Sequence, residues 1–448
     1  MPTLPILRRS RRAPADEPGP PGAPGGEDDA ASAAGRPTGD VGARATATPP
    51  SARTTGTPAP VRRALAIAIG VAAVVTVAAT IVLWPPHPHP PTPPGLTSPV
   101  APVRGNVLLV RSYPCASIGS SVPSSLPAPA AMQCQTAQVL IQSGPDRGQI
   151  VGVDQLGQAG LPQLRAGDHV LLVRGTEGNG TVTYGFYDFQ RGRPLALIAL
   201  LFAVLVIVVG RWRGLGALIG LGITWLVMVK FVLPAILEGR DPLSVSLTGA
   251  ALIVLIVLFV AHGFSARTAT AVLGTLMSLL VVDVISRVTV HATALTGLAT
   301  EESQYLQSVV GDVRVQGLLL GGVVIGALGV LNDVTVTQSS SIWEIHAADP
   351  GLRPLALYRS GMRVGRDHIA STVYTLVLAY AGAALPTLLL FTLAGQKLGR
   401  LVTSETIAEE VVRTLVGSIG LVLAVPLTTL LAAAVVTRGA MRQEAAGA

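Results

Sequence analysis

Long apolar runs dominate this sequence and limit what it can fold into. Half of its 448 residues are hydrophobic and only 13% are charged, a balance far from that of a soluble globular domain. A helix needs about 20 apolar residues to cross the hydrocarbon core of a bilayer. Runs of roughly that length occur at 64–84, 194–210, 215–237, 244–262, 268–286, 315–337, 369–392 and 412–436. We therefore predict an all-α polytopic membrane bundle of about eight transmembrane helices.

The basic residues flank these runs. The net charge of +7 comes almost wholly from arginine, since Lys230 and Lys397 are the only lysines. Short loops that carry arginine stay on the cytoplasmic side of a membrane. The arginines at 62–63, 211–213 and 353–366 fit this rule when both termini are cytoplasmic. The charge thus indicates orientation, and we expect no nucleic-acid partner.

The segments outside the runs differ in composition. Residues 1–60 are rich in Pro, Gly, Ala and Arg and lack an apolar period, so we expect them to be disordered in the cytoplasm. Residues 104–190 carry five short alternating or β-branched stretches that turn residues separate. They predict a small extracytoplasmic β domain between helices 1 and 2, an OB-like barrel or sandwich. The remainder is a seven-helix membrane domain at 194–436 and a cytoplasmic tail at 437–448.

Both cysteines of the chain fall in this β domain. Cys115 and Cys134 flank an insert rich in Pro and Ser. An oxidising compartment favours a disulfide between them. Two unpaired thiols are the alternative, and no further His or Cys ligands lie nearby to form a zinc site.

Asp333 is the leading candidate for a functional residue. It lies in GALGVLNDVTVTQSSSIWE beside Asn332, in a helix whose Gly322, Gly326 and Gly329 have the spacing of close helix packing. An ionisable group at membrane depth is costly and is usually functional, for example as a proton carrier. Because the run ends at 337, however, Asp333 would lie about one turn from the cytoplasmic end, where wet headgroups are the alternative surroundings.

Three further charged residues lie inside apolar runs. Asp283 and Arg287 are four residues apart and share a helix face, which suits either an internal ion pair or a transport site. Lys230 would extend to the interface by snorkelling. If it faces the bundle instead, Asp283 or Asp333 is its natural partner.

A polar segment at 338–368 is predicted to be a cytoplasmic loop. Glu344, Arg366 and Asp367 in this segment are candidates for a cytoplasmic gate. Alternatively, Asp367 caps the next helix and Arg366 only marks the cytoplasmic side.

Four segments carry a resemblance to a known family. They are YDFQRGRPLALIALLF (187–202), LTGLATEESQYL (295–306), GLLLGGVVIGALGVLNDVTVTQSSSIWE (317–344) and SGMRVGRDHIASTVYTLVLAYAGAALP (360–386). Together they resemble the YibE/F family of bacterial membrane proteins over about residues 104–436. The resemblance implies a multi-pass protein of the bacterial cell membrane with a loose link to transport. Asn332, Thr337, Gln338, His368 and Ala370 depart from the family pattern.

Three classes of function compete. A secondary transporter or permease for a small solute or ion, coupled to protons or cations through an intramembrane Asp, is our first choice. A non-transporting scaffold whose β domain binds an envelope partner is the alternative. An intramembrane hydrolase is the least favoured class, because no paired-acid, Ser-His or HExxH motif is present. An ATP-driven motor is also disfavoured, because the sequence has no Walker A or Rossmann motif. We expect no enzyme activity, catalytic residue, cofactor or metal. The expected partners are the lipid bilayer, the solute and either a second copy of the chain or an envelope protein.

Overall fold

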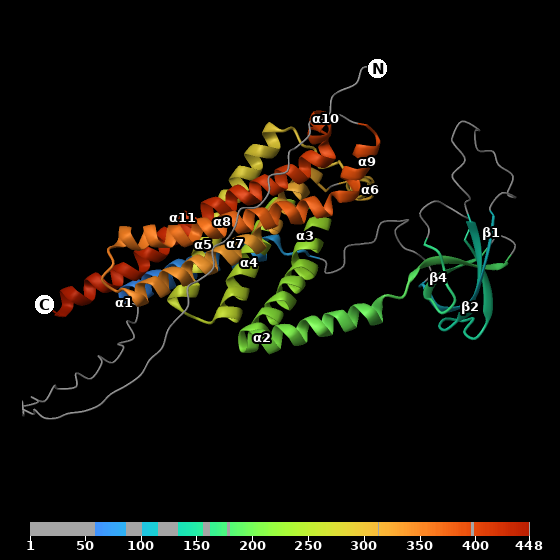
Figure 1. Cartoon of the computed structure of the whole chain (residues 1–448), viewed down its shortest axis with the longest axis horizontal. Helices are drawn as coiled ribbons and strands as arrows, with labels where there is room; N and C mark the ends of the chain where they lie inside the picture. Colours follow the sequence, from blue (N-terminus) through green and yellow to red (C-terminus); the bar gives the residue numbers. More distant parts are fainter. Residues whose placement is uncertain are drawn as a thin grey trace, which may run out of the picture. The chain divides into compact units, whose positions relative to one another are not determined.

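The computed structural model describes residues 59–86, 101–114, 133–155, 162–176, 180–311, 313–395 and 398–447. Of the segment predicted to be disordered, only Ala59 and Pro60 are described, and they begin the first helix. Lys397 and Cys115 lie outside the described residues. Helices dominate, and a small antiparallel sheet accompanies them (Figure 1).

Most helices are long enough to cross a bilayer. Six helical segments have the length and apolar composition of a span, and α8 with α9, which meet at 59°, makes a seventh. The helices are α1 (Ala59–Leu83), α2 (Gly192–Val227), the π-helix η1 (Met228–Val232), α3 (Leu233–Leu237), α4 (Pro242–His262), α5 (Ala266–Ala292), α6 (Glu301–Val309), α7 (Val315–Ala348), α8 (Pro354–Ala383), α9 (Leu385–Leu393), α10 (Leu398–Val402) and α11 (Glu405–Gly447).

The predicted count of eight differs because α2, η1 and α3 run on as one helical segment of 46 residues. This segment bends at Arg211, whose φ of 52° breaks the helix. A Cβ on Gly214 would lie 2.1 Å from the carbonyl oxygen of Val206, although eight residues of straight helix would separate the two by about 12 Å. The arms on either side of Arg211 therefore fold toward each other, and Figure 1 shows the sharp bend. Eight spans remain a prediction that depends on both arms crossing.

The segment predicted to be a loop at 338–368 is helical except for a short turn at 349–353. α7 continues through its serines to Ala348, and α8 already begins at Pro354. α7 can continue through these serines because their hydroxyls donate hydrogen bonds to carbonyl oxygens within the bundle. Ser341 donates to the carbonyl of Thr337 at 2.9 Å. Farther on, Ile342 and Leu357 are fully buried in a shared cluster with α11.

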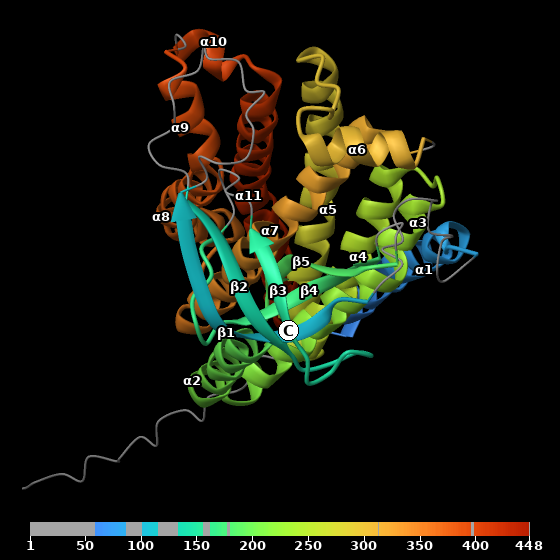
Figure 2. The ribbon, with the colours of Figure 1, turned by 90° about the vertical axis from the view of Figure 1, so that its right-hand side faces the viewer.

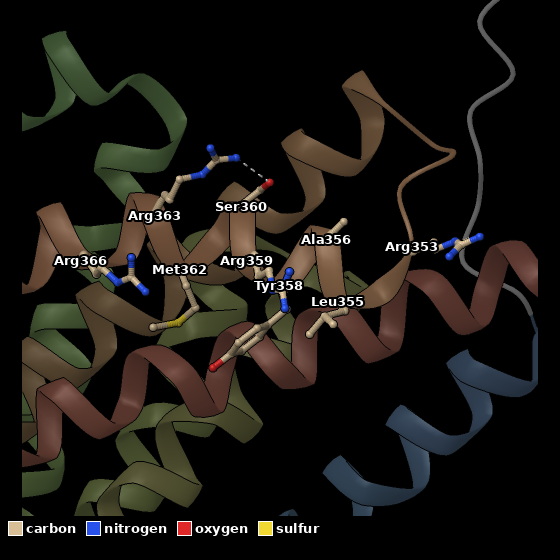
Figure 3. Close-up of a pocket in the computed structure, with 9 residues that line it drawn as sticks. All are labelled: Arg353, Leu355, Ala356, Tyr358, Arg359, Ser360, Met362, Arg363 and Arg366. Atoms are coloured by element: carbon tan, nitrogen blue, oxygen red, sulfur yellow. Dashed lines mark hydrogen bonds between the residues drawn. The ribbon is translucent and has the colours of Figure 1, made fainter.

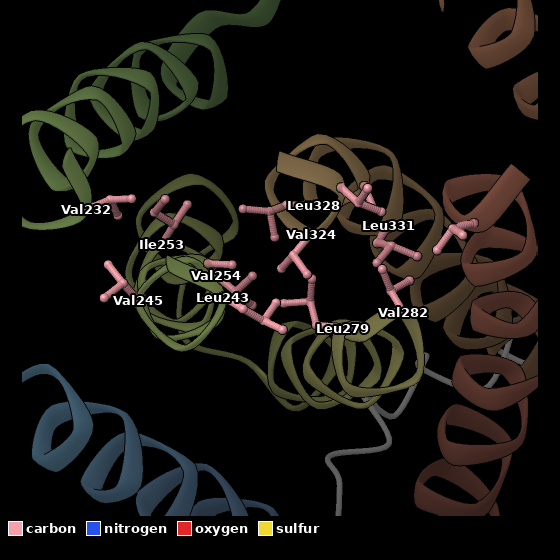
Figure 4. Packing of buried hydrophobic residues seen from close by; sticks show 14 of the residues in the cluster. Val232, Leu243, Val245, Ile253, Val254, Leu279, Val282, Val324, Leu328 and Leu331 are labelled. Carbon is pink, nitrogen blue, oxygen red and sulfur yellow. The ribbon is translucent and has the colours of Figure 1, made fainter. Parts of the chain in front are cut away.

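The bundle centres on α7, which contacts α4, α5, α8 and α11 (Figure 2). Figure 4 shows side chains of α4, α5 and α7 meeting in one cluster, with Leu331 of α7 near Val282 of α5. Helix backbones also approach closely. A Cβ on Gly420 of α11 would lie only 2.2 Å from a methyl group of Val282. Such contacts between small residues and neighbouring helices replace the hydrophobic effect as the packing force inside lipid.

The β domain is one five-stranded antiparallel sheet. Its strands are β1 (Val103–Pro114), β2 (Gln133–Ile141), β3 (Ile150–Gln155), β4 (His169–Thr176) and β5 (Val182–Phe189), in the order β3-β2-β1-β4-β5. All five predicted strands are present, and their alternating residues, such as Val107, Val139 and Val170, form the core. Among the described residues the edge strands β3 and β5 share no ladder, so closure into an OB-like barrel stays a prediction. Cys134 of β2 is buried and disulfide-bonded.

Candidate functional site

Asp333 lies near the middle of α7. It is 18 residues from Val315 and 15 from Ala348 at the ends of the helix. The hydroxyl of Ser339 donates to the carbonyl of Arg267 in the first turn of α5 at 2.8 Å. Asp333 lies six residues before Ser339, which is about 9 Å along the axis of α7 and away from the level of the first turn of α5. α7 continues well beyond residue 337, so Asp333 is not near an end of its helix, and its depth in the bilayer stays a prediction.

His368 of α8 is the partner of Asp333. Its Nε2 atom lies 3.7 Å from Oδ2 of Asp333, and it too is near the middle of its helix. The distance is longer than a hydrogen bond, and the buried Nε2 atom has no hydrogen-bond partner within the described chain. An acid and an imidazole at this separation can hold one proton between them without net charge. In the sequence, His368 departs from the family pattern and follows the gate candidates Arg366 and Asp367, but nothing there indicates that it lies beside Asp333.

The face of α7 that carries Asp333 is open. The side chain of Asp333 is 67% exposed. Gly322, Gly326 and Gly329 lie on the same side, at spacings of four and three residues. A Cβ on Gly322 or Gly329 would meet nothing within 4 Å, and one on Gly326 would meet only the Tyr380 hydroxyl at 3.0 Å. Contrary to expectation, Gly322 and Gly329 do not pack against another helix of the described chain, whereas Gly326 lies against Tyr380 of α8.

A buried polar seam, which the sequence analysis missed, joins α5, α7 and α11. The hydroxyls of Thr275 and Thr335 lie 2.6 Å apart, and Thr429 donates to the Gln338 side-chain oxygen at 3.3 Å. All four side chains are fully buried. The Nε2 atom of Gln338 and the side-chain oxygen of Asn332 are buried without a hydrogen-bond partner in the described part of the chain. The recurrence of threonine within apolar runs was the only sequence signal for this seam.

The other charged candidates do not converge on Asp333. Arg287 donates through Nε to both carboxylate oxygens of Asp283 at 3.1 and 3.2 Å, so these two residues form the internal ion pair. Lys230 is exposed on η1. Across the described residues, no ion pair or hydrogen bond joins Asp333 to Asp283 or either acid to Lys230. The contacts of the described residues therefore do not join these three side chains in one site.

Arg287 instead faces a cavity of about 520 Å³ where α4, α5 and α7 meet, together with Arg314 and Asp241. Asp241 caps α4 by accepting from the backbone N–H and hydroxyl of Ser244 at 3.0 and 2.7 Å. Burial raises the pKa of the Asp241 carboxyl, but these hydrogen bonds and the nearby arginines outweigh it, and the net shift is downward. The Asp241 carboxylate is thus ionised and caps the first turn of α4.

The gate candidates are separated as well. Glu344 pairs with Arg267 at 3.5 Å, and its side chain is 75% exposed. Arg366 and Asp367 are exposed on α8, and neither has an ion-pair partner among the residues described. Asp367 does not cap a helix, since α8 begins 13 residues earlier at Pro354.

The long apolar helices, the small sheet and the intramembrane polar groups define a multi-pass helical membrane protein. The model of the YibE/F-like protein family matches residues 198–438, which is more than half of the chain. The protein therefore belongs to the YibE/F-like family, as the sequence motifs indicated. Neither curated proteins nor solved structures give a significant match.

Proposed function

We propose that this chain is a secondary transporter of the bacterial cell membrane, with both termini in the cytoplasm, and not an enzyme. It moves a small solute or ion and couples that movement to protonation of the Asp333–His368 pair. The observation that carries the proposal is that both groups lie inside helices of the bundle, far from the helix ends, and 3.7 Å apart.

Two features of the surroundings support this role. A lone carboxylate at membrane depth is costly, whereas an acid that shares a proton with an imidazole can change protonation state at a lower cost. The glycine face of α7 beside Asp333 leaves backbone and space for a ligand. The two groups can therefore take up and release a proton while a solute occupies the open face.

The test does not require a known substrate. Full-length protein is reconstituted into vesicles with a pH gradient, incubated with a small-molecule extract of bacterial cells, and the vesicle contents are profiled by mass spectrometry. We expect at least one solute to accumulate in a gradient-dependent manner. Asp333→Asn and His368→Gln should each reduce that accumulation by roughly a hundredfold, the lower range for loss of a proton-transfer group.

Glu344→Gln is the matched control, because it removes an acid from the same helix near its exposed end. It should transport like the wild type. If no solute distinguishes wild type from Asp333→Asn while both remain folded, proton coupling through this pair is wrong.

One observation favours the alternative, a scaffold that binds an envelope partner through its β domain. Large apolar side chains are exposed on three strands, namely Leu108, Leu109, Ile150, Val182 and Tyr187. A photocrosslinker at Tyr187 that captured one dominant envelope protein, in a chain without gradient-driven accumulation, would establish this function instead.

A further inference from the structure

Three arginines form a row on the first half of α8. Arg359, Arg363 and Arg366 are spaced by four and three residues, so their side chains project from one helix face. All three are exposed, and Arg353 precedes them at the start of the helix. Together with Leu355, Met362 and neighbouring residues they line a pocket of about 750 Å³ (Figure 3). We call Arg359, Arg363 and Arg366 the arginine row.

The opposite face of α8 fixes the direction of the row. A Cβ on Gly361 would lie 2.4 Å from a carbon of Ile342, and one on Gly365 would lie 2.5 Å from Nε2 of Gln338. These glycines hold α8 against α7 and α11, and Leu357 on the same side is fully buried. The helix therefore cannot rotate to bring the arginines inward.

The positive charge of the row is not neutralised within the described part of the chain. No acidic side chain there forms an ion pair with the row or with Arg353. Among the residues described, the side chains of the row make one hydrogen bond, from Arg363 to the hydroxyl of Ser360 at 3.1 Å, which Figure 3 shows. Guanidinium groups that face outward in this way suit phosphate, which they bind through paired hydrogen bonds.

The row lies level with the end of a neighbouring span. Gly365 is beside Gln338, and Ser339 next in sequence bonds the carbonyl of Arg267 in the first turn of α5. A group bound at the row therefore lies where α5 enters the bilayer surface. The apolar side chains of Leu355 and Met362 between the arginines suit the glycerol and upper acyl carbons of a lipid.

We propose that the arginine row binds the phosphate of an anionic phospholipid headgroup. Basic pockets at this depth on the cytoplasmic side recognise such headgroups. The proposal is independent of transport, because it concerns lipid occupancy and not flux.

The experiment uses full-length protein in detergent and measures bound lipid by native mass spectrometry, with phosphatidylglycerol and phosphatidylcholine as probes. In the triple variant Arg359→Gln, Arg363→Gln and Arg366→Gln, the affinity for phosphatidylglycerol should fall by roughly a hundredfold. The weak binding of phosphatidylcholine should not change. The matched control replaces three exposed arginines of the β domain with Gln, namely Arg104, Arg111 and Arg165, and should leave both affinities unchanged.

Two further arms make the outcome decisive. A triple Arg→Lys variant of the row keeps the charge but loses the paired hydrogen bonds of the guanidinium groups. Its affinity for phosphatidylglycerol should lie between those of the wild type and the glutamine variant, which separates lost charge from misfolding. Inorganic phosphate at the lipid's concentration should not displace phosphatidylglycerol. Displacement by phosphate, an equal loss for both lipids, or an unchanged affinity in the glutamine variant would each overturn the proposal.

Discussion

Asp333 and Asp283 show how neighbours decide what an intramembrane acid does. Asp283 is 12% exposed and bonded twice by Arg287, so its charge is balanced along one helix. Asp333 is 67% exposed, and Nε2 of its neighbour His368 lies 3.7 Å away, beyond hydrogen-bond distance. The first acid is therefore balanced by a permanent cation, whereas the second has only an imidazole beside it.

The ion pair at Asp283 yields a stability prediction. Arg287→Gln should destabilise the protein by about 1–3 kcal/mol, because it leaves a largely buried carboxylate unbalanced while the half-exposed arginine limits the cost. Adding Asp283→Asn should recover most of the loss. Thermal unfolding in detergent measures both. Lys230→Gln, an exposed and unpaired cation, is the control and should have little effect. An Arg287→Gln variant as stable as the wild type would contradict a structural role.

The helices and strands take their lengths from interactions across the fold. α7 and α8 extend into the predicted loop because Ile342 and Leu357 are buried together against α11. In the β domain, the turn between β2 and β3 is held to β4 and β5. Asp146 in this turn accepts hydrogen bonds from Tyr184 and from Arg174, the latter at 2.9 Å.

These bonds make the sheet sensitive to acid. The hydrogen bond from Tyr184, followed by that from Arg174, lowers the pKa of Asp146 below its ordinary value of 3.8. A lowered folded-state pKa adds stability above the unfolded value, and that stability is lost as the pH falls through the folded value. Hydrogen-exchange protection of β2 and β3 should therefore be constant near neutral pH and fall in strong acid.

The variant Asp146→Asn should lack this acid-dependent loss and show lower protection near neutral pH. Asp154→Asn removes a second acid of the same sheet, whose carboxylate accepts from Thr136 at 2.8 Å. It should keep the acid-dependent loss and serves as the control. An identical acid profile in wild type and Asp146→Asn would assign the loss to other carboxyl groups.

The path of the whole chain through the membrane depends on the bend at Arg211. If both arms of α2 cross, then the bend and the α7–α8 turn lie on one side and α6 lies on the other. α6 begins after the cap residue Thr300, whose hydroxyl accepts from the backbone N–H of Ser303 at 3.2 Å. The positive residues near the bend and the turn favour the cytoplasm for both.

Single introduced cysteines test this path. In sealed, right-side-out vesicles, an impermeant thiol reagent should label Gln304→Cys in α6 at once. It should label Trp212→Cys and Gly351→Cys only after permeabilisation. The unaltered chain, whose described cysteine is already disulfide-bonded, is the background control. If Trp212→Cys is labelled together with Gln304→Cys, neither arm of α2 crosses and eight spans are wrong.

Local composition was enough to predict the helical membrane class and the five strands. These follow from segment hydrophobicity and residue alternation. Composition could not predict that Asp333 lies beside His368 or that Gly322 and Gly329 contact no neighbouring helix. Nor could it predict the hydrogen bond between Thr275 and Thr335. Each of these depends on how one helix is rotated and how far it slides against another. Packing contacts between residues far apart in the chain set both quantities, and a periodic apolar run allows many such arrangements.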